Sequence, residues 1–303
     1  MKNNTLTKGK IIKLGLDKVD VITSDMLDGY TSIGEFAFRV CKNLKSITIP
    51  NSITKIGACA FDYNISLNSI TIPNSVVKIG DFCFDGCRSL KQITIPKSVT
   101  SIGRGAFYSC YNLQSIVVES GNKKYDSREN CNAIIETSTN TLIVGCKKTI
   151  IPNSVKSIGN GAFFKCIKLK SINIPESITN ILKYSFYKCE NLKTIVIGNN
   201  EYKVNEIVDG KCKAYKAFHA DMTCFNGYLY REGKTYEIDG KPELCKRGLH
   251  ACLNLLDVFN YYNGEIGKDV VVHEVELEGV SEETSIDDSK VVAKKMTIGK
   301  RIL

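Results

Sequence analysis

No apolar run in this 303-residue sequence approaches the roughly 20 residues that a helix needs to cross a bilayer. Residues 1–20 mix lysine, asparagine and threonine and lack the apolar stretch of a secretory signal peptide. A cytoplasmic location is therefore expected, although a signal removed ahead of residue 1 would leave no trace. No segment resembles a known nucleic-acid-binding motif, which argues against a specific nucleic-acid partner.

Acidic residues are scarce in the first two thirds of the chain. Residues 1–200 carry 26 Lys and Arg against 14 Asp and Glu, whereas residues 201–303 carry 15 against 18. Such a step in charge favours a domain boundary near residue 200. The basic part would attract an acidic protein surface or an anionic glycan. Because its lysines are spread over its whole length, a solvated lysine-rich surface is the simpler interpretation.

A 23-residue repeat is the strongest pattern present. Ile33, Ile56, Ile79 and Ile102 follow one another at this step, as do Ile158 and Ile181. A unit this short cannot bury its apolar face alone, so six such units must stack into a solenoid. Phenylalanine recurs at the same step and predicts an internal column: Phe38, Phe61, Phe84, Phe107, Phe163 and Phe186.

Each repeat also carries a strand signal. Leu44, Ile47 and Ile49 follow the L-x-x-I-x-I pattern, in which alternate residues point inward. Proline follows the strand in most repeats, where its missing N–H does least harm. Glycine after the recurring isoleucine suits a tight turn or a close approach of two backbones.

These residues resemble the BspA-like leucine-rich-repeat family, whose repeats read S-I-x-x-I-G-x-x-A-F-x-x-C-x-x-L-x-x-I-x-I-P. The resemblance covers residues 30–200 and implies a leucine-rich-repeat solenoid, with residues 1–29 as an N-terminal cap. Two positions depart from the pattern, Asn64 in place of cysteine and Leu182 in place of glycine, and both predict imperfect packing or capping.

One segment, residues 122–154, interrupts the period. It is similar to the insertion found in many such proteins of gut bacteria. Its I-I-E-T-S-T-N-T-L-I-V run places turn residues between two β-branched stretches, which predicts a β-hairpin.

The 13 cysteines largely follow the repeat. One cysteine per turn predicts a buried column of free thiols and not a disulfide framework. Outside the column, Cys245, His250 and Cys252 are metal-capable, but their spacing matches no common structural zinc site. The sequence therefore predicts no bound metal and no cofactor.

The period stops near residue 211. Residues 201–212 are expected to form a linker, and residues 213–303 a small α+β domain with a strand at 270–279 and a short helix at 253–262. This part resembles an uncharacterised domain found at the C-termini of bacterial and phage proteins. The matching segments are Leu244-Cys-x-x-Gly-Leu-His-Ala-Cys and Asp257-Val-Phe-Asn-Tyr-Tyr.

A weaker resemblance links the same segments to ADP-ribosyltransferases of the poly-ADP-ribose-polymerase type. It implies an NAD cleft in which the side chain at His250 stacks on nicotinamide, Tyr261 or Tyr262 forms a wall, and an acidic group orients the ribose. Histidine stands here where those enzymes have tyrosine, no acidic residue can be assigned, and His219 is the only candidate for their first histidine. The other interpretation is an unrelated binding or structural domain.

The sequence thus favours binding over catalysis: a non-catalytic scaffold whose repeats hold a protein or glycan partner. One alternative is a solenoid that targets an ADP-ribosyltransferase-like domain. Another is a phage structural or host-modulating protein. A further alternative is that the strand positions only keep the repeats in register and bind no ligand. The expected binding surface consists of outward strand positions and an adjacent basic edge: Lys45, Ser46, Thr48, Thr71, Lys91, Thr94, Lys170 and Lys193.

Overall fold

The computed structural model describes residues 4–224, 227–244, 249–262, 264–283, 285 and 288–303. The chain forms two compact units, Met1–Pro152 with Phe163–Leu169, and Asn153–Ala162 with Lys170–Leu303. Its repeats build the β-solenoid that the 23-residue period predicts, and this solenoid has about eight turns. None of the helices in the described residues has the length and hydrophobicity of a bilayer span.

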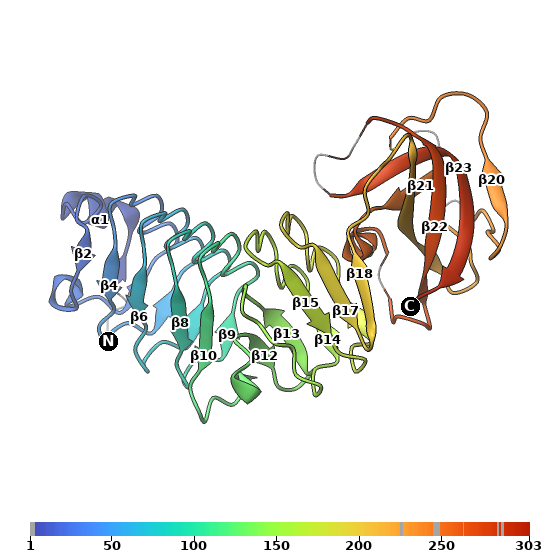
Figure 1. The fold of residues 1–303 in the computed structure, drawn as a ribbon. Helices are drawn as coiled ribbons and strands as arrows, with labels where there is room; N and C mark the ends of the chain where they lie inside the picture. The colour runs from blue at the N-terminus through green and yellow to red at the C-terminus, as the bar shows by residue number, and fades with distance from the viewer. Residues whose placement is uncertain (1–3, 225–226, 245–248, 263, 284, 286–287) are drawn as a thin grey trace. The chain divides into compact units, whose positions relative to one another are not determined.

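Short parallel strands line two sides of the first unit (Figure 1). On one side lie, in order, β1 (Thr5–Leu6), β3 (Ser32–Ile33), β5 (Lys55–Ile56), β7 (Lys78–Ile79) and β9 (Ser101–Ile102), and from β3 onward each strand follows the last by one repeat. On the other side lie β2 (Val21–Ile22), β4 (Ser46–Thr48) and β6 (Ser69–Thr71), followed by the pair β8 (Gln92–Ile95) and β10 (Ser115–Val118). Helix α1 (Lys8–Lys13), capped by Thr7, and the 3-10 turn η1 (Asp25–Leu27) precede the repeats.

The inserted segment forms the expected hairpin. β12 (Ile134–Glu136) pairs antiparallel with β13 (Thr141–Val144), and β11 (Tyr125–Asp126) pairs with β12 from its other edge. A 3-10 turn, η2 (Arg128–Asn130), joins β11 to the hairpin.

Two further repeats belong to the second unit. β14 (Ser157–Ile158) pairs with β16 (Asn180–Ile181), and β15 (Ser171–Ile174) pairs with β17 (Thr194–Ile197), all in parallel. β18 (Asn200–Lys203) then turns back antiparallel to β17. This last strand lies at the start of the segment for which the sequence predicts a linker.

The phenylalanine column is the centre of the repeat core. The rings of Phe38 and Phe61 stack with centroids 5.2 Å apart and planes 4° from parallel, and the next two steps measure 5.4 Å. All six phenylalanines of the column are buried. Each repeat therefore completes the aromatic layer of its neighbour, which explains why one repeat alone has no core.

The recurring glycines serve a close approach and not a turn. A Cβ on Gly80 would lie 2.4 Å from the backbone nitrogen of Ala58 in the preceding repeat, and one on Gly57 would lie 2.6 Å from that of Glu35. The left-handed backbone of the turns falls at other positions, which are often not glycine, such as Phe82 with φ 51° and Val40 with φ 60°. The sequence alone gave no sign of these strained residues.

A hydrogen-bonded column runs beside the rings. The thiol of Cys110 donates to the carbonyl oxygen of Phe84 at 3.2 Å. At the same place in its own repeat, the amide of Asn64 donates to the carbonyl oxygen of Phe38 at 2.9 Å. Asn64 is fully buried, so it replaces the thiol bond instead of leaving a packing gap, although its Oδ1 has no partner among the described residues.

The C-terminal part of the second unit is a sheet that closes on itself. β23 (Lys290–Arg301) pairs antiparallel with β21 (Leu249–Cys252) on one side and with β22 (Val270–Val280) on the other, and β19 (Lys211–His219) joins β21 to β22. A short strand, β20 (Thr235–Glu237), pairs with β23. The strands are longer than the sequence suggested, so the domain is richer in sheet than expected.

The expected short helix is a 3-10 helix, η3 (Leu255–Asn260). The side chain of Asn254 caps it by accepting from the backbone N–H of Leu256 at 3.0 Å. Every residue of η3 is buried, so the segment lacks the polar face of a surface helix and is held by tertiary packing.

Candidate functional site

The strand face of the repeats carries the residues expected to bind a partner. Thr48 pairs in register with Thr71, and Thr94 pairs with Val117. Gln92 and Thr94 are exposed on either side of the buried Ile93, as the alternation of β8 requires, and Lys91, just before this strand, is exposed as well. Of the remaining candidates Ser46 is partly buried, and the others are exposed: Lys45, Thr48, Thr71, Lys170 and Lys193.

The lysine edge is divided between the two units. Lys45 and Lys91 lie in the first, and Lys170 and Lys193 lie in the second. The ammonium of Lys45 forms an exposed ion pair with Asp20 at 3.2 Å, which partly neutralises that end of the edge.

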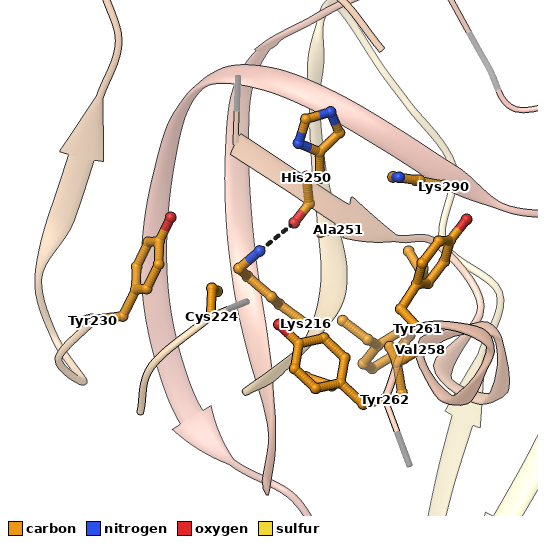
Figure 2. A pocket seen from close by; sticks show the side chains of 12 residues that line it. Lys216, Cys224, Tyr230, His250, Ala251, Val258, Tyr261, Tyr262 and Lys290 are labelled. Atoms are coloured by element: carbon orange, nitrogen blue, oxygen red, sulfur yellow. Dashed lines mark hydrogen bonds between the residues drawn. The ribbon is translucent and has the colours of Figure 1, made fainter. Parts of the chain in front are cut away.

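A separate cavity of about 330 Å³ lies in the C-terminal domain. It is bounded by β19, β21, the start of β23, η3 with the two residues after it, and the segment between β19 and β20. His250, Tyr261 and Tyr262, which the sequence singled out, all line it, as Figure 2 shows. Sequence reasoning missed other polar lining residues, among them Lys216, Tyr230 and Lys290.

Lys216 is the central charge of this cavity. Its ammonium donates to the carbonyl oxygen of His250 at 2.8 Å and lies 5.5 Å from the centre of the Tyr230 ring. Burial is the largest cause that lowers the pKa of Lys216. The Cys224 and Cys252 thiols act against this shift, and Lys290 adds to it. Among the described residues, no carboxylate comes within ion-pair distance of Lys216.

Lys290 brings a second ammonium to the cavity. Its Nζ lies 4.5 Å from the centre of the Tyr261 ring. The hydroxyl of Tyr261 donates to Asp288, whose other carboxylate oxygen accepts from the backbone N–H of Lys290. Asp288 is therefore bound to these groups and is not among the residues that line the cavity.

The Cys252 thiol is a poor nucleophile. Burial raises the pKa of Cys252 well above its usual value, and the carboxylates of Asp257 and Asp288 raise it further. Burial also raises the pKa of Tyr262, and a hydrogen bond with Cys224 acts in the same direction. A neutral thiol and a neutral phenol suit a binding wall better than covalent catalysis.

The cavity lacks one part of the transferase chemistry that the weaker resemblance implies. His250 and the two tyrosines are brought together, but no carboxylate belongs to the described lining that could orient a ribose. His219 stacks edge-on against Tyr262 with ring centres 5.4 Å apart, and it does not line the cavity.

Metal ligation gains no support from the described residues. His250 and Cys252 stand two positions apart on β21, and both line the cavity. The third residue of the motif, Cys245, lies outside the described part. No group of three metal-capable side chains occurs within the described part of the chain.

Six copies of the BspA type leucine rich repeat region match the chain, over residues 18–136 and 133–220. The chain belongs to the BspA-type leucine-rich-repeat family. Residues 212–303 match a domain of unknown function, DUF7666, in agreement with the uncharacterised C-terminal domain expected from the sequence. The search of curated proteins gave no match.

Several solved structures resemble the BspA-type region. A leucine-rich repeat protein from Eubacterium ventriosum is 26% identical, with a TM-score of 0.44, over 59% of this chain and 60% of that one. The pneumococcal vaccine antigen PcpA is 20% identical, with a TM-score of 0.47, over 60% of this chain and 49% of its own. A T. pallidum leucine rich repeat protein is 28% identical, with a TM-score of 0.37, over 61% and 71%. The alignment thus spans three fifths of the first of these proteins and half of the second.

Proposed function

We propose that the BspA-type repeats form a non-catalytic scaffold that binds an acidic protein surface or an anionic glycan. The observation that carries the proposal is the set of exposed lysines beside polar columns held in strand register, at Lys45, Lys91, Lys170 and Lys193. Within each unit, strands about 4.8 Å apart set the spacing of these side chains, at two repeats for Lys45 and Lys91 and at one repeat for Lys170 and Lys193. An extended polymer with negative groups at multiples of this spacing matches each pair.

The balance of charge supports this choice of partner. Residues 1–200 carry 12 more basic than acidic residues. A field of that sign raises the association rate with anionic partners and makes binding sensitive to salt. The strand face is also shallow and polar, which suits a macromolecule better than an enclosed small ligand.

Retention on heparin and on a poly-glutamate resin tests the proposal. Replacing Lys45, Lys91, Lys170 and Lys193 together by glutamine should lower the eluting salt concentration markedly. The matched control removes the same charge from four exposed lysines elsewhere on the repeats: Lys55, Lys78, Lys97 and Lys156. Equal decreases in eluting salt concentration for the two quadruple variants would show that retention depends on overall charge and not on these four lysines.

A second candidate, an NAD-binding C-terminal domain, is favoured by one observation, the convergence of His250, Tyr261 and Tyr262 on one cavity. If it holds, NAD should raise the melting temperature by mass action, and His250→Ala should abolish both that shift and any nicotinamide release. The missing carboxylate in the described lining makes this the weaker candidate. An unchanged melting temperature in millimolar NAD would exclude the NAD-binding function.

A further inference from the structure

Lys216 is a cation without a counter-ion among the residues that the structure describes. It is partly buried on β19, and its contacts are one carbonyl oxygen, the Cys224 thiol and the rings of Phe218 and Tyr230. An ammonium has three N–H donors, and withdrawing its charge from water without a carboxylate costs free energy. An apolar residue would fill this inward position at lower cost, so the charge requires another explanation than packing.

The second ammonium strengthens the case. Lys290 lines the same cavity and lowers the pKa of Lys216 by its positive charge. Two like charges that face one cavity repel each other. A bound anion would offset this repulsion and would supply Lys216 with a counter-ion.

The walls of the cavity are apolar and aromatic. Tyr230 and Tyr262 are each only 8% exposed, and Ala217, Ala251 and Val258 complete the lining near them. Tyr230 packs against Tyr228 and Tyr236 with ring centres 5.0 and 4.8 Å apart, which fixes its plane. Rigid aromatic walls favour a flat ligand, and about 330 Å³ lies at the small end of ligand-site volumes.

We propose that this cavity binds a small aromatic anion, a carboxylate or phosphate carried on a flat ring. Lys216 and Lys290 hold the charged group, and the Tyr230 and Tyr262 rings flank the flat part. Figure 2 shows Lys216 between Cys224 and Tyr262, with its ammonium directed at the His250 carbonyl. This site is independent of the strand face on the repeats, which shares no residue with it.

Calorimetric titration of the full chain with benzoate, phenyl phosphate and benzyl alcohol tests the inference. The two anions should bind, and the neutral alcohol should bind about tenfold more weakly or not at all, since it lacks the charged hydrogen bonds. Lys216→Met should lower the affinity for the anions about tenfold, and Lys241→Met, which removes an exposed lysine of the same domain that does not line the cavity, should not.

The melting temperature of Lys216→Met separates a ligand site from a structural role. Because methionine removes a partly buried charge, the variant should melt at or above the wild-type temperature while losing the anion response. If it fails to fold, Lys290→Met, at the start of β23, provides the same affinity comparison. An anion affinity that stays at the wild-type value in both variants, or equal binding of benzyl alcohol, would overturn the inference. The quadruple lysine variant of the strand face should still bind benzoate, which keeps this test separate from that of the scaffold.

Discussion

The thiol of Cys87 donates to the carbonyl oxygen of Phe61 at 3.2 Å, across the boundary between two repeats. Asn64 makes the equivalent bond one repeat earlier, to the carbonyl oxygen of Phe38. Two chemically different side chains thus donate to equivalent backbone carbonyl oxygens in adjacent repeats. Without such a donor, a buried carbonyl loses the bond that offsets its removal from water.

Asn64→Ala should therefore destabilise the chain by about 1–3 kcal/mol, because it leaves the Phe38 carbonyl without its donor. Asn64→Cys should lower the stability by less, because cysteine occupies this place in the next two repeats. The substitution also eliminates the Asn64 Oδ1, which has no partner among the described residues. Urea unfolding measures both. Equal losses in the two variants would show that volume, and not the hydrogen bond, matters here.

The alternation of β8 gives a matched pair of substitutions. Ile93 is 2% exposed and pairs with Ile116, whereas Thr94 is exposed. Ile93→Asp should destabilise the repeats by roughly 3–5 kcal/mol through an unpaired buried charge, and Thr94→Asp should stay within about 0.5 kcal/mol. Similar melting temperatures for the two variants would mean that the inward face is misassigned.

Close backbone contact at Gly80 predicts an intolerant position. Gly80→Ala would place its Cβ 2.4 Å from the Ala58 nitrogen, so adjacent repeats must separate and stability should fall by several kcal/mol. Gly9→Ala, in α1, has no neighbour within 4 Å and should be neutral or slightly stabilising. Thermal melts of the two variants compare them, and a tolerated Gly80→Ala would contradict the packing described here.

Asp257 predicts a specific dependence on pH. Burial raises the pKa of this carboxyl to about 6, although Ser289 donates to it at 2.9 Å. The native state therefore binds the proton more tightly than the unfolded chain, whose aspartate titrates near 3.9. Above pH 6 the charge is buried at a cost of about 2–3 kcal/mol, which disappears as the pH falls from 6 to 4.

Asp257→Asn keeps an oxygen acceptor for Ser289 and cannot ionise. The difference in unfolding free energy, variant minus wild type, should be larger by about 2–3 kcal/mol at pH 7.5 than at pH 4. The measured quantity is the change of this difference with pH, because a difference that is the same at every pH reflects only the replacement of the carboxyl by an amide. A difference that does not vary with pH would show that Asp257 titrates normally.

The cysteine column predicts low thiol reactivity. Cys41 and Cys87 of this column are buried, and burial raises the pKa of Cys166 to about 12. The twelve described cysteines are free thiols, and we propose that the protein works in a reducing compartment. A thiol reagent at pH 8 should label few column cysteines in native protein and all of them in urea, as counted by mass spectrometry. Disulfides in protein purified without reductant would contradict the proposal.

The repeat could be predicted because its signal is redundant. A wrong register would displace the isoleucines, the phenylalanines and the thiols together, so one alignment satisfies all three. The hairpin at residues 134–144 was predictable for a simpler reason, since polar turn residues separate two β-branched runs.

The cavity was only half predictable. Tyr261 and His250 stood in motifs, but Lys216 occupies an ordinary-looking strand in which Ala214 and Phe218 face the core. A lysine among the inward-facing positions of this strand was the one sign that the sequence offered. It indicates a cavity only once the pairing of β21 with β19 is known. The helix predicted over 253–262 is the shorter η3, and its burial on all sides is a tertiary feature that periodicity in ten residues cannot reveal.

The constant step of 23 residues has a consequence for how such a protein changes over generations. Removing the segment from Ile56 to Lys78 would place Ile79 against Ile33 and the ring of Phe84 against that of Phe38, which are contacts of a kind already present. An in-frame duplication would likewise introduce no new type of contact. The length of the surface, and with it the size of partner that it accommodates, can therefore vary by recombination between repeats without a search for a new core.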